Sequence, residues 1–485
     1  MGQIIAALDL GTSKSIALVA QKEDSGKISV IQTESIASKD AIRRGRVYNS
    51  DETSEIISKL ILKLNNNSAM QVEKIYVGIG GQSLHTQQFI VKKTVDNGTI
   101  TQQLLDSIEE EALSFKPEFE ENLGVFSYEY YADGQLVTTP KGTMASVIEA
   151  RFQLIAGNPC LKRNLETVIN DKNIHVAGYF ISPVATAKAV LTQEEKESGC
   201  ALIEFGDGVT YISIYKNKDL KYLVTLPLGG LAITKDIRSL NVLESEAETL
   251  KIKYGSAIPD QNNQETIQVN KEQNSSWEIK LYDLNCIIEA RVEEIVKNIW
   301  NLIQISGYSN ALNAGIVITG GGALLRDLPQ FIKNQTGKGV RLANDLHPAN
   351  SCVTGLVTMG EENCVKEELI LSPFLSEKEK EKERQKEKEK QREEEKERQR
   401  QIDKEREKEK IRQKEEEKER QREIKRRKQT EGDKKIIKGV KSFINKGLDL
   451  FKDEDFEDTT NKPVEKDFVK IQHEDEEIEN NTNKQ

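Results

Sequence analysis

The sequence contains few cysteines and no long apolar run, and both absences limit what the chain can be. Its 485 residues include five cysteines, an odd number, and no two of them are spaced as C-x-x-C. We therefore expect free, buried thiols in a reducing cytosol, and neither a disulfide framework nor a zinc site. No run of about 20 apolar residues occurs, so we expect no membrane-spanning helix.

Net charge and the N-terminal sequence exclude two further classes. The formal net charge is −10, which gives the chain no general affinity for nucleic acid. The apolar segment 4–8 is short and is followed by the carboxylate of Asp9, so we do not expect a signal peptide. The apolar fraction of 36% is lowered by the highly charged C-terminal part, whereas residues 1 to about 372 have the pattern of a folded region with two or more domains.

A short turn motif occurs twice, each time at the end of an apolar run. The first run ends in Asp9, and residues 11–14 read Gly-Thr-Ser-Lys before the chain becomes apolar again. The second run ends in Glu204, and residues 206–208 read Gly-Asp-Gly. A third glycine cluster, 320–322, follows another apolar run. The first two motifs predict strand–turn–strand hairpins with a carboxylate at the end of the first strand.

Turns of this composition suit a polyphosphate. Without side chains the backbone approaches closely, and several N–H groups then lie within hydrogen-bonding distance of the phosphates. Thr12 and Ser13 add hydroxyl donors, and Lys14 adds a cation. Asp9 and Glu204 beside phosphates fit the outer ligands of a hydrated Mg²⁺. Alone, each motif fits an ordinary β-turn; together, in this order, they predict two lobes that close on a nucleotide.

Strands alternate with helices in the rest of the folded region, which favours an α/β fold. Residues 85–159 are more polar and are predicted to be an inserted subdomain. The polar segment 261–276 is predicted to be a surface loop. Apolar spacing predicts helices over 54–64, 104–115, 161–169, 184–191, 232–237, 245–254 and 282–305.

The order of these motifs resembles the nucleotide fold of the actin, Hsp70 and sugar-kinase superfamily. Within it, the chain is similar to the FtsA family of bacterial cell-division proteins over about residues 3 to 362. FtsA proteins also carry a subdomain of their own at the insertion point near residue 84. The similarity depends on the combination of Tyr-Val-Gly-Ile-Gly-Gly at 76–81, the segments 185–192 and 246–255, Thr-Leu-Pro-Leu-Gly-Gly at 225–230, and Val-Ile-Thr-Gly-Gly-Gly-Ala at 317–323.

The resemblance implies an actin-like, two-lobed, ribonuclease-H-like α/β fold and a division of the chain. The implied parts are the lobe 1 core (1–84 and 160–195), an FtsA-type inserted subdomain (85–159), the lobe 2 core (196–229 and 308–372), a lobe 2 subdomain (230–307), a charged single helix or linker (373–430), an amphipathic membrane-binding helix (431–452) and an acidic disordered tail (453–485).

The resemblance also implies site roles. Glycines 320–322 would back the adenosine and its phosphates, and Gly229 and Gly230 would line the second phosphate turn. Glu248 and Lys251, at i and i+3 on one helix face, would reach the ribose and base. Without the resemblance, this pair is better explained as a solvated ion pair, and the two glycines equally well as a plain loop.

The predicted cofactors are ATP and Mg²⁺, with the metal held through water by Asp9 and Glu204. No catalytic residue is assigned. The predicted nucleotide-binding residues are Asp9, Gly11, Thr12, Ser13, Lys14, Glu204, Gly206, Asp207, Gly208, Thr210, Gly229, Gly230, Glu248, Lys251, Gly320, Gly321 and Gly322.

Two departures from the family pattern concern hydrolysis and the metal. Related folds often have Asp in place of Glu204 and glycine in place of Asp207. The Asp207 carboxylate would be repelled by phosphates unless it also faces the metal. Near Ser182 and Pro183 there is no acidic or Gln residue to orient an attacking water. We therefore expect ATP binding with slow hydrolysis or none.

The C-terminal part contains two distinctive segments. Residues 377–428 are almost entirely Glu, Lys, Arg and Gln, which predicts a single solvated helix, with a disordered charged linker as the alternative. The segment 434–451 has one apolar stripe edged by lysines, as in helices that lie in a membrane interface; docking on the core or on a partner is the alternative. The predicted membrane-binding residues are Ile436, Ile437, Val440, Phe443, Ile444, Leu448 and Phe451, with Lys434, Lys435, Lys438 and Lys441.

The resemblance implies an actin-like, ATP-binding division protein, at most a weak ATPase, that polymerises at the cytoplasmic face of the bacterial membrane and anchors FtsZ there. Its implied partners are FtsZ, anionic lipids of the inner membrane, further copies of itself and other division proteins. Two alternatives remain: a cytosolic kinase or chaperone ATPase of the superfamily, and a pilus-assembly relative of FtsA. The catalytic Asp of a sugar kinase and the β-rich domain of a chaperone are not found, and the lysine-edged helix argues against the pilus relative.

Overall fold

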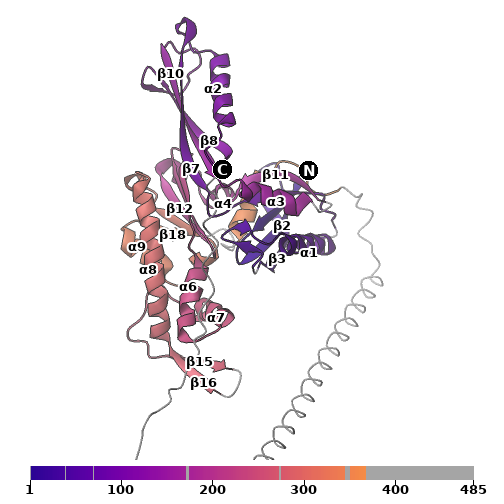
Figure 1. Cartoon of the computed structure of the whole chain (residues 1–485), viewed down its shortest axis with the longest axis vertical. Helices are drawn as coiled ribbons and strands as arrows, with labels where there is room; N and C mark the ends of the chain where they lie inside the picture. The colour runs from indigo at the N-terminus through magenta and orange to yellow at the C-terminus, as the bar shows by residue number, and fades with distance from the viewer. Residues whose placement is uncertain are drawn as a thin grey trace, which may run out of the picture. The chain divides into compact units, whose positions relative to one another are not determined.

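The folded region is built on two large mixed sheets with helices packed against them, and two small two-stranded sheets are added to these (Figure 1). The computed structural model describes residues 2–366, except for 39, 69, 171–173, 272–274 and 344–349. The charged stretch 377–428, the amphipathic segment 434–451 and the acidic tail lie outside the described residues, so what the sequence indicates for them stays a prediction.

The first sheet has five strands in the order β11-β6-β1-β2-β3. Strands β11 (His175–Ile181), β6 (Lys74–Ile79) and β1 (Gln3–Leu10) are parallel, whereas β2 (Lys14–Lys22) and β3 (Ile28–Ala37) continue the sheet antiparallel. The central strand β1 buries four consecutive apolar side chains, as expected where both faces of a sheet are covered. Helices α1 (Ser50–Ser68) and α10 (Ser351–Met359) pack against this sheet.

The second sheet repeats this arrangement with β18-β17-β12-β13-β14. Here β18 (Val340–Leu342), β17 (Ile316–Thr319) and β12 (Cys200–Phe205) are parallel, and β13 (Thr210–Lys216) and β14 (Asp219–Leu226) are antiparallel. The hairpin β12–β13 therefore occupies the place in the second sheet that β1–β2 occupies in the first. Both predicted hairpins are confirmed, and the two halves of the folded region share one strand order.

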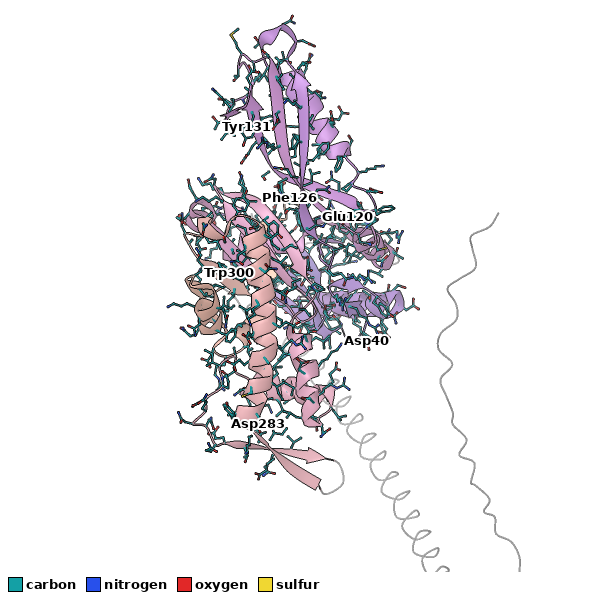
Figure 2. The ribbon with its side chains drawn as sticks, turned by 60° about the vertical axis from the view of Figure 1, so that its left-hand side comes forward. Asp40, Glu120, Phe126, Tyr131, Asp283 and Trp300 are labelled. Atoms are coloured by element: carbon teal, nitrogen blue, oxygen red, sulfur yellow. The ribbon has the colours of Figure 1, made fainter. Side chains whose placement is uncertain are left out.

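The segment inserted in the first half extends the sheet of the second half. Its strands β7 (His85–Thr94), β10 (Val147–Gly157), β8 (Glu121–Ala132) and β9 (Gln135–Val137) follow β14 in the sheet, joined by the pair Val224 and His85. Helix α2 (Gln102–Ser114) encloses a separate core with these strands. On β8, Phe126 lies closer to the rest of the fold and Tyr131 further out (Figure 2).

The second half is completed by helices α6 (Gly230–Ile237), α7 (Glu244–Tyr254), α8 (Leu281–Ile305) and α9 (Leu328–Thr336). The long helix α8, which carries Asp283 and Trp300, runs beside the second sheet (Figures 1 and 2). It buries Leu284, Ile288, Val292 and Ile295, which follow the spacing of one helical face. The helix predicted over 282–305 is thus confirmed.

The prediction of a surface loop over 261–276 is wrong. Strands β15 (Thr266–Lys271) and β16 (Ser275–Lys280) form a two-stranded sheet there. Ile267, Val269 and Ile279 are buried in the core of the second half and alternate with polar neighbours. This alternation, with a period of two residues, is typical of a strand with one buried face. The segment is so polar overall that the alternation does not stand out in the sequence.

After α10 the chain returns along the first sheet. The Cys364 N–H donates to the carbonyl oxygen of Ile4 on β1 at 2.8 Å, and the Cys364 carbonyl accepts from the N–H groups of Glu73 and Lys74. The Lys22 ammonium donates to the carbonyls of Thr358 and Gly360, each at 2.8 Å. A cation at the C-terminal end of α10 also suits the helix dipole. The chain is therefore fixed to the first sheet as far as its last described residues.

The five cysteines are free thiols, as predicted. Cys200, Cys352 and Cys364 are buried, whereas Cys160 and Cys286 are only partly buried, so the prediction of burial is wrong for these two. Within the described residues, no helix is both long enough and apolar enough to cross a membrane.

Gly355 provides a test of the packing between α10 and α4 (Ser182–Val190). A Cβ at this position would overlap the carbonyl oxygen of Ala185. In an exposed helix the change Gly355→Ala would stabilise by about 1 kcal/mol, but overpacking typically costs about 1–3 kcal/mol. We predict net destabilisation, measured by urea unfolding. Gly339→Ala is the control, because a Cβ on Gly339 would meet no atom of the described residues within 4 Å. Equal urea midpoints for the two variants would contradict the contact between α10 and α4.

Candidate functional site

A cavity of about 470 Å³ lies where the turns of the two halves meet. Residues of β1–β2, β12–β13, α6, α7 and the segment 320–326 line it. Of the predicted nucleotide-binding residues, all except Thr210 and Gly229 are in this lining. Thr210 is buried in β13, where its hydroxyl donates to the carbonyl of Leu228 at 2.8 Å.

The first turn is tight because β1 and β2 pair up to Leu10 and Ser15. A Cβ on Gly11 would lie 2.6 Å from the carbonyl oxygen of Lys14, so a side chain does not fit there. Among the described residues, the Lys14 ammonium makes no hydrogen bond or ion pair, although it lines the cavity. It is therefore available to an anion.

The second turn has the same construction and touches the first. A Cβ on Gly206 would lie 2.6 Å from the carbonyl oxygen of Val209, which repeats the relation between Gly11 and Lys14. A Cβ on Gly208 would lie 2.6 Å from the Thr12 hydroxyl oxygen of the opposite half. The structure thus brings the two glycine turns together at one cavity.

Asp9 and Glu204 stand near the ends of β1 and β12, and both are partly buried and line the cavity. Burial raises the pKa of the Asp9 carboxyl. Burial, and then the charge of Asp9, raises the pKa of Glu204 to about 8. The Oε2 atom of Glu204 is buried and has no hydrogen-bonding partner among the described residues. Two carboxyl groups in this position resist simultaneous ionisation unless a cation meets them.

Three further side chains that the sequence analysis does not assign lie beside this pair. The Cys352 thiol donates to Asp9 Oδ1 at 3.3 Å. The Ser182 hydroxyl lowers the pKa of Asp9 and the Thr186 hydroxyl lowers that of Glu204, so each partly opposes the effect of burial. Neither hydroxyl makes a hydrogen bond of ordinary geometry with another described residue. Cys352 is 343 positions from Asp9 along the chain, so no local spacing could have indicated the contact.

Tyr211 links the second half to a turn of the first. Its hydroxyl oxygen accepts from the N–H of Gly81 at 2.7 Å, and a Cβ on Gly80 would lie 2.6 Å from the same oxygen. Burial, and then the charge of Glu204, holds the Tyr211 pKa well above its usual range, so the hydroxyl stays protonated. Gly80 therefore makes room for the Tyr211 hydroxyl, and Gly81 holds it through its N–H.

Helix α7 contributes the predicted pair Glu248 and Lys251. Their charged groups are 2.7 Å apart, and the Lys251 side chain is only 12% exposed. Lys251 also donates to the Gly230 carbonyl at 3.0 Å and to the Thr234 hydroxyl at 2.8 Å. The pair lines the cavity and joins α7 to α6. The Lys251 ammonium is therefore held by α6 and is not solvated as a lysine on an isolated helix would be.

The start of α6 supports the second turn from behind. The N–H of Gly230 donates to the Gly206 carbonyl at 3.0 Å, and the N–H of Leu231 donates to the Asp207 carbonyl at 2.9 Å. A Cβ on Gly229 would lie 2.5 Å from both carbonyl oxygens. Gly229 and Gly230 therefore hold the turn by close backbone packing. Burial raises the pKa of the Asp207 carboxyl, and the nearby Lys251 ammonium opposes this effect.

The third glycine cluster closes over the end of β12. Gly320 has φ +89°, and a Cβ there would lie 2.5 Å from the Phe205 carbonyl oxygen. A Cβ on Gly322 would overlap the Phe205 ring, whereas Gly321 faces open space. Gly320 and Gly322 are thus required by packing, and Gly321 leaves its backbone accessible in the cavity wall.

The repeated strand order and the cavity between the two central hairpins define an actin-like α/β protein. Among solved structures, the chain is similar to the PilM–PilN type IV pilus biogenesis complex, with a TM-score of 0.52 and 13% identity over 74% of this chain and 98% of that one. At this level of identity the similarity shows the fold. The predicted actin-like fold is thereby confirmed.

Sequence comparison identifies the family within this class. The family model for cell division protein FtsA matches residues 201–356. The chain is 32% identical to cell division protein FtsA of Porphyromonas gingivalis over 344 residues, which cover 70% of this chain and 72% of that protein. It is 31% identical to the Neisseria meningitidis protein over 67% of this chain and 80% of that one. The chain belongs to the FtsA family and is an actin-like cell-division protein.

The pKa of Glu204 predicts how the stability of the ligand-free protein depends on pH. The folded value is about 8, above the ordinary 4.5, so the folded state retains a proton that the unfolded chain releases. This contribution to stability is complete below about pH 4.5 and is lost as the pH rises through about 8. Because Glu204→Gln cannot ionise, we expect its Tm relative to wild type to increase across that interval.

Thermal unfolding across this pH interval measures the difference. Glu118→Gln is the matched control, since Glu118 is exposed and outside the cavity lining. A Tm difference between Glu204→Gln and wild type that does not change with pH would contradict the raised pKa of Glu204.

Proposed function

We propose that this division protein binds ATP with Mg²⁺ between its two halves, assembles with further copies at the cytoplasmic face of the membrane, and anchors FtsZ there at the division site. The observation that carries the proposal is the contact between the turns 11–13 and 206–208, which come from opposite halves and meet at one cavity. Membership of the FtsA family supports the role in division.

The phosphate chain would lie between the two turns. Their backbones approach the cavity without side chains at Gly11, Gly206 and Gly208, and the Lys14 ammonium has no partner of its own among the described residues. Glu248 and Lys251 would meet the ribose and base, with Gly321 behind them. Because Lys251 already bonds α6, its head group is held in position before a ligand arrives.

The carboxyl pair fits a hydrated Mg²⁺. Glu204 Oε2 has no partner among the described residues, and burial makes the doubly ionised pair unfavourable without a cation. Asp9 and Glu204 would contact waters of the metal rather than the metal itself, since Mg²⁺ retains several waters beside phosphates. No group of three or more His, Cys, Asp or Glu side chains suited to a metal ion occurs among the described residues. The bound metal would neutralise phosphate charge.

We predict that hydrolysis is slow. Ser182, which lines the cavity beside Asp9, offers only a weakly basic hydroxyl, and the two nearby carboxyl groups are proposed to be engaged with the metal's waters. Steady-state phosphate release should therefore fall far below the roughly 1–1,000 per second typical of enzymes. Release at many turnovers per minute by the purified protein would overturn this expectation.

The segment 434–451, which lies outside the described residues, is the proposed membrane anchor. Its apolar residues fall on one helical stripe edged by lysines, and each lysine near an anionic surface contributes about 1 kcal/mol. One such helix binds reversibly, whereas linked copies bind with avidity. The charged stretch 377–428 would act as a spacer, and the part of the second half within 230–307 would meet FtsZ.

Co-sedimentation with vesicles containing anionic lipid, with and without FtsZ and Mg²⁺-ATP, tests the anchor. We predict that Phe443→Glu, which places a charge in the apolar stripe, abolishes sedimentation of this protein and of FtsZ with vesicles. Asn445→Glu adds the same charge on the opposite side of the helix and is expected to reduce binding only slightly. Equal losses in the two variants would show that charge alone, and not an embedded stripe, governs binding.

A further inference from the structure

Arg46 is a cation of the cavity wall that neither the sequence motifs nor the proposed ligand contacts use. It is partly buried and lines the cavity, as Lys14 does. Among the described residues it makes no hydrogen bond or ion pair. By contrast, Lys251 pairs with Glu248, and Arg326 donates to the carbonyl of Tyr254. A half-buried guanidinium without a partner is unfavourable unless an anion meets it.

Arg46 lies on a small hairpin that is fixed to both halves. Strands β4 (Ile42–Arg43) and β5 (Arg46–Val47) flank Gly45, which has φ +72°. The Gly45 N–H donates to the Thr12 hydroxyl of the first turn at 3.0 Å. A Cβ on Gly45 would lie 3.0 Å from the Tyr211 hydroxyl of the second half. The residue after Gly45 is therefore held beside the place where the two turns touch.

The two neighbouring arginines of this hairpin have partners and do not line the cavity. Arg43 stacks over the ring of Tyr48 at 3.8 Å and pairs with Asp40, labelled in Figure 2, at 3.2 Å. Arg44 donates to Gln82 Oε1 at 3.3 Å. Of the three, only Arg46 is in the cavity lining. The hairpin thus directs one unpaired guanidinium to the cavity.

The position of Arg46 indicates which part of an anionic ligand it meets. The proposed ribose and base contacts, Glu248 and Lys251, belong to α7 of the second half and join the second turn through Gly230. Arg46 belongs to the first half and joins the first turn through Gly45 and Thr12. A phosphate chain that starts at α7 and passes between the turns therefore reaches Arg46 last.

We propose that Arg46 binds the terminal phosphate of a nucleoside triphosphate and so makes the site prefer triphosphate to diphosphate; this rests on the proposed nucleotide binding. A guanidinium offers two parallel N–H donors to phosphate oxygens, a stronger contact than a single ammonium donor gives. A diphosphate is one group shorter and leaves Arg46 unpaired. Preference for the triphosphate follows from that difference.

The test is calorimetric titration of the full chain with Mg²⁺-ATP and with Mg²⁺-ADP. We expect Arg46→Gln to lower ATP affinity roughly 10- to 100-fold while ADP affinity changes less than about threefold. Arg46→Lys keeps a charge and is expected to retain part of the preference. The Arg46→Lys variant also keeps the test valid if the Arg46→Gln variant unfolds at a lower temperature.

Arg44→Gln is the matched control, because it removes a guanidinium from the same hairpin outside the cavity and should leave both affinities unchanged. Unchanged ATP affinity in Arg46→Gln would overturn the inference while leaving nucleotide binding intact, as would an equal loss for ATP and ADP. A wild-type chain that binds neither nucleotide would overturn the proposed nucleotide binding and this inference together.

Discussion

Two carboxyl groups that the fold brings to one cavity, both of them partly buried, set the requirements for the surrounding structure. Asp9 and Glu204 end the central strands of the two repeated sheets, and the pKa of each is raised by burial. The pair is stable with one proton retained or with a cation nearby, but not as two bare charges. Under the proposed function, a metal ion that arrives with the phosphates would supply that cation.

The two halves can approach each other closely because several of the residues at their contact are glycines, which have no side chain. Gly208 makes room for Thr12, and Gly80 makes room for the Tyr211 hydroxyl. Gly320 and Gly322 pack on Phe205 at the end of β12. Each glycine allows a backbone segment to approach the other half or the adjoining strand without a Cβ between them. The same glycines expose their backbone to the cavity. The lack of side chains at these positions therefore allows both the packing of the two halves and the formation of the cavity wall.

The parts of the site that can be predicted from sequence are those with a local signature. An apolar run, a carboxylate and a glycine turn stand within a few residues of one another around Asp9 and again around Glu204, so both hairpins are predictable. Arg46 and Cys352 have no such signature, because the folding of distant segments brings them to the cavity. The alternation in β15 and β16 is too short to stand out, and Lys251 makes its decisive contacts with α6, which the spacing on its own helix does not indicate.

The return of the chain along the first sheet has a mechanical consequence. The segment that ends at Lys366 hydrogen-bonds Ile4 near the start of β1, and Asp9 stands at the other end of that same strand. Tension applied to the chain beyond Lys366 would act first on the bond from the Lys366 N–H to the Gln71 carbonyl. It would act next on the bond from Cys364 to Ile4 and, through β1, on Asp9 at the cavity. A pull on the chain after Lys366 and a ligand at the cavity would therefore both bear on one strand, β1, which carries Ile4 near its start and Asp9 near its end.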